Sequence, residues 1–225
     1  MSEELITVLY RNAKPERAAP MAAYMKNQFP FLGIGKPERA ALEAPFIRQA
    51  VKAGAADWPF IRRLWTLPER EFQYCAVDHL LALGKLLAKD AIEEIEGLIT
   101  AKSWWDTVDS LSVVVGTLCA NYPELVASHI LRWSVSPNSW LARTAILFQR
   151  KYKTATDREL LGRIITQNTG SKEFFINKAI GWALREYSKT DPAWVRAFIA
   201  GHRLHPLSMR EGSKYLADSP ASKKQ

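Results

Sequence analysis

The segment EFQYCAVDHL, residues 71–80, shows the pattern that decides the fold. Its apolar side chains recur at intervals of three and four, at Phe72, Cys75, Ala76 and Leu80. This is the period of an amphipathic helix, and it continues through almost the whole chain, so we predict an all-α protein. One run, Leu111 to Leu118, contains three consecutive valines that favour a strand. It lies within a longer helical pattern, and we therefore expect a buried helix there.

Segments of this character also repeat along the chain. WLARTAILFQ (140–149) and FFINKAIGWAL (174–184) resemble residues 71–80, and the series has centres about 34 residues apart, near Ala76, Ser112, Ala145, Ala179 and Ser213. Such a period fits two helices and two turns, which predicts a HEAT-like helical-repeat solenoid with a concave groove. Prolines mark the expected helix starts, at Pro20, Pro37, Pro68, Pro123, Pro137 and Pro192. No Gly- or Pro-rich linker interrupts the series. We therefore predict a single HEAT-like domain over residues 1–216 and a flexible tail over 217–225.

The charge of the chain favours an anionic partner. Its 31 Lys and Arg residues against 23 Asp and Glu residues give a net charge of +8, which alone does not separate nucleic acid from an anionic membrane surface. No apolar run approaches the ~20 residues of a membrane span, so we expect no membrane association. Cys75 and Cys119 stand in apolar helical contexts and suggest neither a disulfide nor a metal site, which favours the cytoplasm. The four histidines have no metal-ligand spacing, and we expect no metal and no cofactor.

The segment KSWWDTVDS, residues 102–110, compresses two tryptophans and two aspartates into one helical stretch. Trp105 and Asp109 are four residues apart, which places an indole and a carboxylate on one face of a helix. A structural explanation is also open: one tryptophan belongs to the core, and both aspartates are solvated. Alternatively, Ser103 caps the helix, with Asp106 in the role of a capping-box residue.

A second group of aromatic and basic residues follows in the later repeats. Trp182 and Arg185 are three residues apart and share a helix face, while Arg143 lies in the preceding repeat. Phe174 and Phe175 stand near the start of their helix, where backbone N–H groups and Lys172 can meet a phosphate. If the corresponding helix of each repeat lines the concave face, these side chains converge on one groove. The alternative is that the arginine stems only cover apolar surface.

Several longer strings resemble the AlkD family of bacterial DNA alkylation-repair glycosylases, in order and from about Met21 to Lys214. The strings that carry the resemblance are MAAYMKNQFPFLGI (21–34), LWTLPEREFQ (64–73), KSWWDTVDS (102–110), WLARTAILFQ (140–149) and SKEFFINKAIGWALREY (171–187). The resemblance implies a HEAT-like monomer that binds duplex DNA in its groove and needs no cofactor. It also implies hydrolysis of the N-glycosidic bond of N3- and N7-alkylated purines, which leaves an abasic site without strand cleavage. Such a protein acts in the cytoplasm, on the nucleoid when it is bound to DNA.

The resemblance also implies roles for single residues. Asp109 matches the catalytic carboxylate, and Trp105 and Trp182 match indoles beside the sugar of the lesion. Arg143 matches a DNA-binding arginine close to that aspartate. Further positions resemble residues that shape the groove or contact DNA, namely Tyr24, Phe174, Phe175 and Arg185. The chain departs from the family pattern at Ile34, Gly35 and Lys36, so the resemblance assigns no DNA contact to this loop. The alternative function is a HEAT-repeat scaffold that binds DNA or protein without catalysis.

Overall fold

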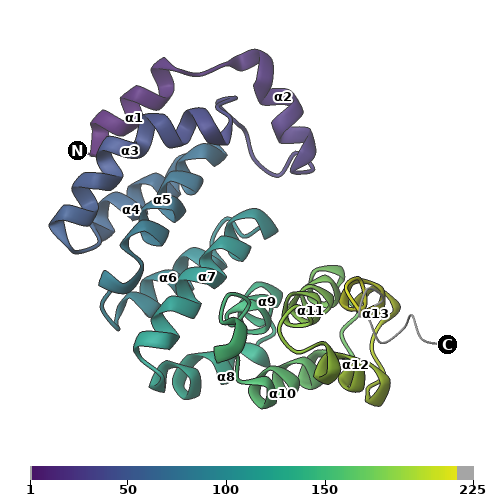
Figure 1. Ribbon diagram of the computed structural model, residues 1–225. Helices are drawn as coiled ribbons and strands as arrows, with labels where there is room; N and C mark the ends of the chain where they lie inside the picture. Colours follow the sequence, from purple (N-terminus) through teal and green to yellow (C-terminus); the bar gives the residue numbers. More distant parts are fainter. Residues whose placement is uncertain (1, 217–225) are drawn as a thin grey trace. The chain divides into compact units, whose positions relative to one another are not determined.

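In a computed structural model that describes residues 2–216, the chain is all helical, and these residues contain no strand (Figure 1). The all-α prediction is therefore confirmed. The valine-rich run Leu111–Leu118 lies within a helix, as expected. The packing of the chain divides it into two compact units, Met1–Glu94 and Ile95–Gln225. The boundary falls inside a helix, and the single domain expected from the sequence stays a prediction. The expected tail, 217–225, lies outside the described residues.

The first unit is built around a central helix, α5. Helices α3 and α4 both pack on α5, and α1 packs on α3 and α4. The apolar periodicity of residues 71–80 explains this arrangement, since Phe72, Cys75, Ala76 and Leu80 are all inaccessible to solvent. The helices of this unit are α1 (Ser2–Arg11), α2 (Pro15–Tyr24), α3 (Lys36–Ala53), α4 (Trp58–Thr66) and α5 (Arg70–Leu83), followed by the 3-10 turn η1 (Gly84–Leu86) and by α6 (Ala91–Thr100), which continues into the second unit.

The segment that leads into the loop of Ile34, Gly35 and Lys36 is held to the first unit by a buried carboxylate. Glu71 accepts hydrogen bonds from the backbone N–H groups of Leu32, Gly33 and Ile34, at 3.0, 2.9 and 3.1 Å. Both Glu71 and Ile34 are inaccessible to solvent. The carboxylate replaces the water that these N–H groups would otherwise bind, and it fixes the entry into α3.

The second unit consists of two rows of helices. In the first row, α7 (Trp105–Asn121), α9 (Ser139–Leu147), α11 (Phe174–Tyr187) and α13 (Pro206–Gly212) each pack on the next member. The second row contains α8 (Leu131–Ser134), α10 (Arg158–Asn168) and α12 (Pro192–Gly201). Two short elements complete the unit, the π-helix η2 (Val126–Ile130) and the 3-10 turn η3 (Lys153–Ala155). The predicted repeat centres fall in α5, α7, α9 and α11, and the last, Ser213, directly follows α13. This regularity is consistent with a helical-repeat solenoid.

Two glycines let neighbouring helices of the first row approach closely. A Cβ atom on Gly116 would lie 2.2 Å from the carbonyl oxygen of Phe148, at the end of α9. A Cβ atom on Gly181 would lie 2.6 Å from the Cβ of Glu211 and 2.9 Å from the carbonyl oxygen of Ser208 on α13. Larger residues at these positions would separate α7 from α9 and α11 from α13.

Helix starts are fixed by capping side chains as well as by proline. A backbone N–H group in the first turn of α4, α9, α10 and α12 donates a hydrogen bond to a side-chain oxygen of the residue before the helix. These residues are Asp57, Asn138, Asp157 and Asp191, respectively. Pro37 and Pro192 stand in first turns, as predicted. Pro20 lies inside α2 instead, because Pro15 already occupies the first turn of that helix. Helix α2 is short and buries no residue, so the lost backbone hydrogen bond is tolerated there.

Candidate active site

A cavity of about 320 Å³ opens on the second unit. Helices α7, α9 and α11 provide its lining, which consists of Trp105, Asp109, Arg143, Phe174, Phe175, Lys178, Trp182 and Arg185. The structure thus brings together all the residues singled out from the sequence except Tyr24 and Lys172. The lining is mainly aromatic and contains three cations. Among the described residues, Asp109 is its only carboxylate.

Asp109 is held rigidly by a two-pronged ion pair. The Nε of Arg143 donates to Oδ1 of Asp109 at 2.7 Å, and Nη2 donates to Oδ2 at 2.9 Å. The guanidinium also donates to the carbonyl oxygen of Phe175 on α11. Asp109 is only 7% exposed and Arg143 only 2%, so both charges are shielded from water. A bidentate pair of this kind fixes the direction of the carboxylate as well as its charge.

The carbonyl oxygen of Asp109 is fixed too. It accepts hydrogen bonds from the hydroxyl of Ser112 at 2.7 Å and from the guanidinium of Arg150 at 3.1 Å. The explanation that Asp109 is solvated is therefore wrong, because its side chain is buried and paired with Arg143. It is a buried acid in a defined position.

The two adjacent tryptophans have different surroundings. Trp104 precedes α7, and its ring centroid lies 5.8 Å from that of Trp140 and 5.0 Å from that of Phe175. Trp105 begins the helix and lines the cavity. The capping role considered for Ser103 is wrong, because α7 begins one residue too late for it and the Ser103 hydroxyl donates to the Ile99 carbonyl at 2.6 Å.

Arg150 is a site residue that the sequence analysis missed. Its guanidinium carbon lies 4.0 Å from the centroid of the Trp182 ring, a cation-π distance. Since the same guanidinium binds the carbonyl of Asp109, it connects the indole of α11 with the acid of α7. Burial lowers the pKa of Arg150. No sequence spacing links Arg150 to Trp182, because the two residues stand in different repeats.

Lys178 is a second residue that the sequence analysis did not single out for the site. Lys178 and Arg185 both line the cavity and both bind the buried carboxylate of Glu211 on α13, at 2.9 and 3.0 Å. Lys214 binds the same carboxylate at 2.9 Å. Hydrogen bonds from Lys214 and Lys178 lower the pKa of Glu211 to about 2. Three cations around one carboxylate leave this side of the cavity positively charged.

Tyr24 and Lys172 do not line the cavity. Tyr24 ends α2 in the first unit, and its side chain is 70% exposed. Lys172 is exposed in the loop before α11. Their roles in DNA contact stay predictions.

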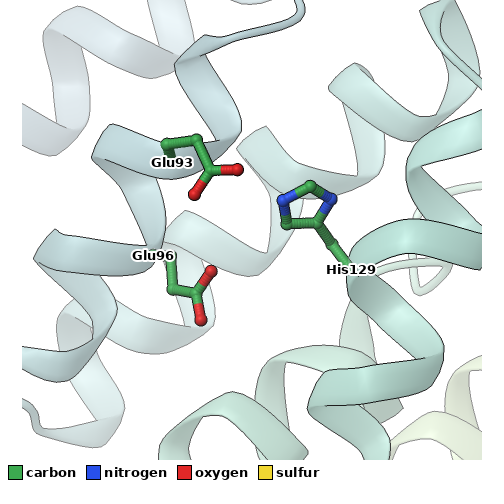
Figure 2. A group of neighbouring side chains, drawn as sticks. All are labelled: Glu93, Glu96 and His129. Carbon is green, nitrogen blue, oxygen red and sulfur yellow. The ribbon is translucent and has the colours of Figure 1, made fainter.

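A separate cluster of potential metal ligands lies on α6 and η2. Figure 2 shows the carboxylates of Glu93 and Glu96 beside the imidazole of His129, and their ligand atoms lie within 4.8 Å of one another. Arg132 occupies both oxygens of Glu96, at 3.2 and 2.8 Å, while Ser128 is 2.8 Å from Nδ1 of His129. A guanidinium at Glu96 competes with a metal cation for the same oxygens. We assign no metal to this cluster, and the expectation of no metal site stays a prediction.

The sequence as a whole matches a family of known role. Residues 5–216 match the family model described as DNA alkylation repair enzyme. The chain belongs to this family. The structure of this DNA alkylation repair protein is similar to that of a predicted DNA alkylation repair enzyme from Enterococcus faecalis, with a TM-score of 0.84 and 36% sequence identity over 92% of this chain and 98% of that one. No curated protein matches the chain.

Membership of the DNA alkylation repair family fits two further properties of the chain. A role in DNA repair agrees with the net charge of +8, which favours the binding of an anionic partner such as DNA. Among the described residues, no helix combines the length and apolar character that crossing a bilayer requires. The family match gives a role in DNA alkylation repair. The type of reaction and its substrate are implied only by the narrower resemblance to AlkD glycosylases.

Proposed function

We propose that the protein is a monofunctional DNA glycosylase of the AlkD type, which hydrolyses the N-glycosidic bond of N3- and N7-alkylated purines in duplex DNA and leaves an abasic site. The observation that carries this proposal is the composition of the cavity. Its lining combines one buried carboxylate, Asp109, with the indoles of Trp105 and Trp182. The same side chains lie in the strings that resemble the AlkD family.

A single carboxylate suffices for alkylated purines because of the charge on the leaving group. Alkylation at N3 or N7 gives the base a formal positive charge, and the base departs as a neutral molecule when the glycosidic bond breaks. No general acid is needed to protonate it. The cavity matches this requirement, since Asp109 is the only carboxylate in its described lining and no second carboxylic acid stands beside it.

The positive charge that develops on the deoxyribose is the species that Asp109 would stabilise. Arg143 uses one lone pair of each carboxylate oxygen, and each oxygen keeps another for the attacking water. The indole faces of Trp105 and Trp182 attract a cation by their π electrons. Because the carboxylate of Asp109 is fixed before the reaction, it would lower the activation barrier by about 3 kcal/mol, which raises the rate on the order of 10²-fold.

The cationic side of the cavity would hold the DNA backbone. Lys178 and Arg185 share Glu211 as a counter-ion, so a phosphate near them meets a net positive charge. Arginine and lysine contacts to phosphate position a protein on DNA without reading its sequence. This fits an enzyme that must find lesions in any sequence.

The test is the release of N7-methylguanine from a defined duplex by the wild type and by Asp109→Asn. We expect the variant to lose at least about 10²-fold in rate. Asp106→Asn is the matched control, because it removes a carboxylate from the same helix outside the cavity, and it should keep the activity. If the wild type releases neither N7-methylguanine nor N3-methyladenine, the protein is a scaffold that binds DNA or protein without catalysis.

Hydrolysis should proceed without a covalent intermediate on lysine. Lys178 is the only amine in the described lining, and its ammonium group pairs with Glu211. A protonated amine is not a nucleophile. We expect borohydride to trap no protein–DNA adduct and the product strand to stay intact until alkali is added. An adduct that disappears in Lys178→Arg would show a lyase instead.

A further inference from the structure

A second cavity lies in the second unit, at the end of α9. Its volume is about 240 Å³, several times the ~30 Å³ of one water molecule in the liquid. The turn that follows α9 and the last part of α11 form its walls. The charged and hydroxyl side chains in the lining are Arg150, Lys153, Thr156, Glu186, Tyr187, Lys189 and Thr190. Three cations thus face one carboxylate.

Arg150 brings a partly buried charge that forms no direct ion pair with a described carboxylate. Burial lowers its pKa, and the charges of Asp109 and Glu186 oppose this larger effect. Within the part of the chain that the structure describes, its contacts are a carbonyl oxygen of Asp109 and the ring of Trp182, and its Nε is buried without a hydrogen-bond partner. The carboxylate of Asp109 is already engaged by Arg143, at 2.7 and 2.9 Å. That of Glu186 pairs with Lys189 at 2.7 Å. Because a buried cation without a partner is unfavourable, an anion in this cavity would be stabilised.

The wall that carries these cations has a fixed conformation. The side chain of Gln149 exchanges two hydrogen bonds with the backbone of Asp157, at 3.1 and 2.8 Å. The hydroxyl of Tyr152 donates to the carbonyl of Gly116 at 2.6 Å. Lys153, which lies between Tyr152 and Asp157 in this wall, has a φ of 54°, in the left-handed region that non-glycine residues rarely adopt. Backbone strain of this kind concentrates at ligand clamps.

We propose that this cavity is a phosphate-binding site, which adjoins the candidate active site and shares Arg150 with it. A tetrahedral phosphate accepts several hydrogen bonds, and its negative charge offsets the excess of three cations, Arg150, Lys153 and Lys189, over the one carboxylate, Glu186. The hydroxyl groups of Thr156 and Thr190 supply neutral donors beside them. The phosphate belongs either to the backbone of bound DNA or to a free phosphate ion, which have the same chemistry at this site. Since Arg150 also touches Trp182, the bound group lies directly behind a wall of the candidate active site.

The experiment compares three double variants of the full chain with the wild type. Lys153→Ala with Lys189→Ala removes two charges from the cavity. Lys36→Ala with Lys52→Ala removes two exposed charges from α3 in the first unit. The double arginine variant, Lys153→Arg with Lys189→Arg, keeps the charges in place and should restore binding. Thermal midpoints in the absence of phosphate check that all variants are folded.

Each variant is titrated with sodium phosphate at constant ionic strength, and its affinity for an undamaged duplex is measured over a range of salt. If the ligand is free phosphate, it stabilises the wild type and the α3 variant saturably, and the cavity variant binds it at least about tenfold more weakly. If the ligand is a DNA phosphate, the salt slope of the cavity variant is lower than that of the α3 variant by about 0.9 per lost contact. Two results together would overturn the proposal. Phosphate binding would be equal or absent in all variants, and their salt slopes would be equal. Neither readout depends on glycosylase activity.

Discussion

At the scale of single residues, Trp104 and Trp105 differ in what their rings touch. The ring of Trp104 packs against those of Trp140 and Phe175, which joins the start of α7 to α9 and α11. The ring of Trp105 lines the candidate active site. Substitutions at the two positions should therefore separate stability from catalysis.

We expect Trp104→Leu to lower the free energy of unfolding by about 1–3 kcal/mol, because two aromatic contacts are lost along with packed area. Trp105→Leu should lower the rate of N7-methylguanine release about tenfold, since an indole face is worth about 1 kcal/mol to a cation. Urea denaturation and single-turnover excision measure the two effects. Equal losses of stability in both variants would contradict the assignment.

Helix periodicity predicts the site residues that share one helix face. Trp105 and Asp109 share a face of α7 at a spacing of four, and both line the cavity. Arg150 was not predicted, because its contact with Trp182 depends on how closely the end of α9 approaches α11. The burial of Asp109 was not predicted from spacing either, since it depends on a partner 34 residues away, Arg143.

At the scale of helices, the contact between α11 and α13 places the cations of the candidate active site. Gly181 lets the two helices approach until Glu211 of α13 reaches Lys178 and Arg185 of α11. Glu211 is thus the counter-ion that orients both cations. Its carboxylate is buried, so its ionisation contributes to the stability of this contact.

Glu211→Gln should lower the free energy of unfolding by about 1–2 kcal/mol at pH 7, because it removes a buried acceptor of charged hydrogen bonds. The folded pKa of Glu211 is about 2, below the unfolded value of about 4.3. Its stabilisation is therefore complete above pH 4.3 and is lost as the pH falls toward 2. Urea titrations at pH 7 and pH 3 should show the gap between wild type and variant shrinking. The exposed Glu159→Gln is the control, and a constant gap would argue against the role of Glu211.

Apolar periodicity predicts the helices well, and it places the centres of α5, α7, α9 and α11 within the observed elements. It is weaker at their ends, as the position of Pro20 inside α2 shows. The division into two units was not foreseen, because it falls inside α6, where the helical pattern of the sequence is not interrupted. Compactness depends on contacts between distant segments, which local spacing does not encode.

At the scale of the whole molecule, each unit buries a carboxyl group whose pKa is shifted, and the two shifts have opposite signs. In the second unit, cations lower the pKa of Glu211. In the first unit, burial and the nearby Asp78 raise the pKa of Glu43 to about 7, against the opposing effect of Arg39. Glu43 is 1% exposed, and its Oε1 lies 3.7 Å from the guanidinium of Arg39. The two units should therefore respond to different ranges of pH.

The first unit should lose stability between about pH 4.3 and pH 7. Over this range the unfolded chain releases the proton of Glu43 while the folded chain retains it, so rising pH favours unfolding. Glu43→Gln removes this dependence and leaves Arg39 its 2.8 Å ion pair with Asp78. Hydrogen exchange of amides in α3 and α5 should therefore show the variant gaining stability relative to the wild type from pH 5 to pH 8. The exposed Glu16→Gln should show no such change. If the difference between Glu43→Gln and the wild type is the same at both pH values, Glu43 is already ionised in the folded protein at pH 5 and Arg39 outweighs the cost of its burial.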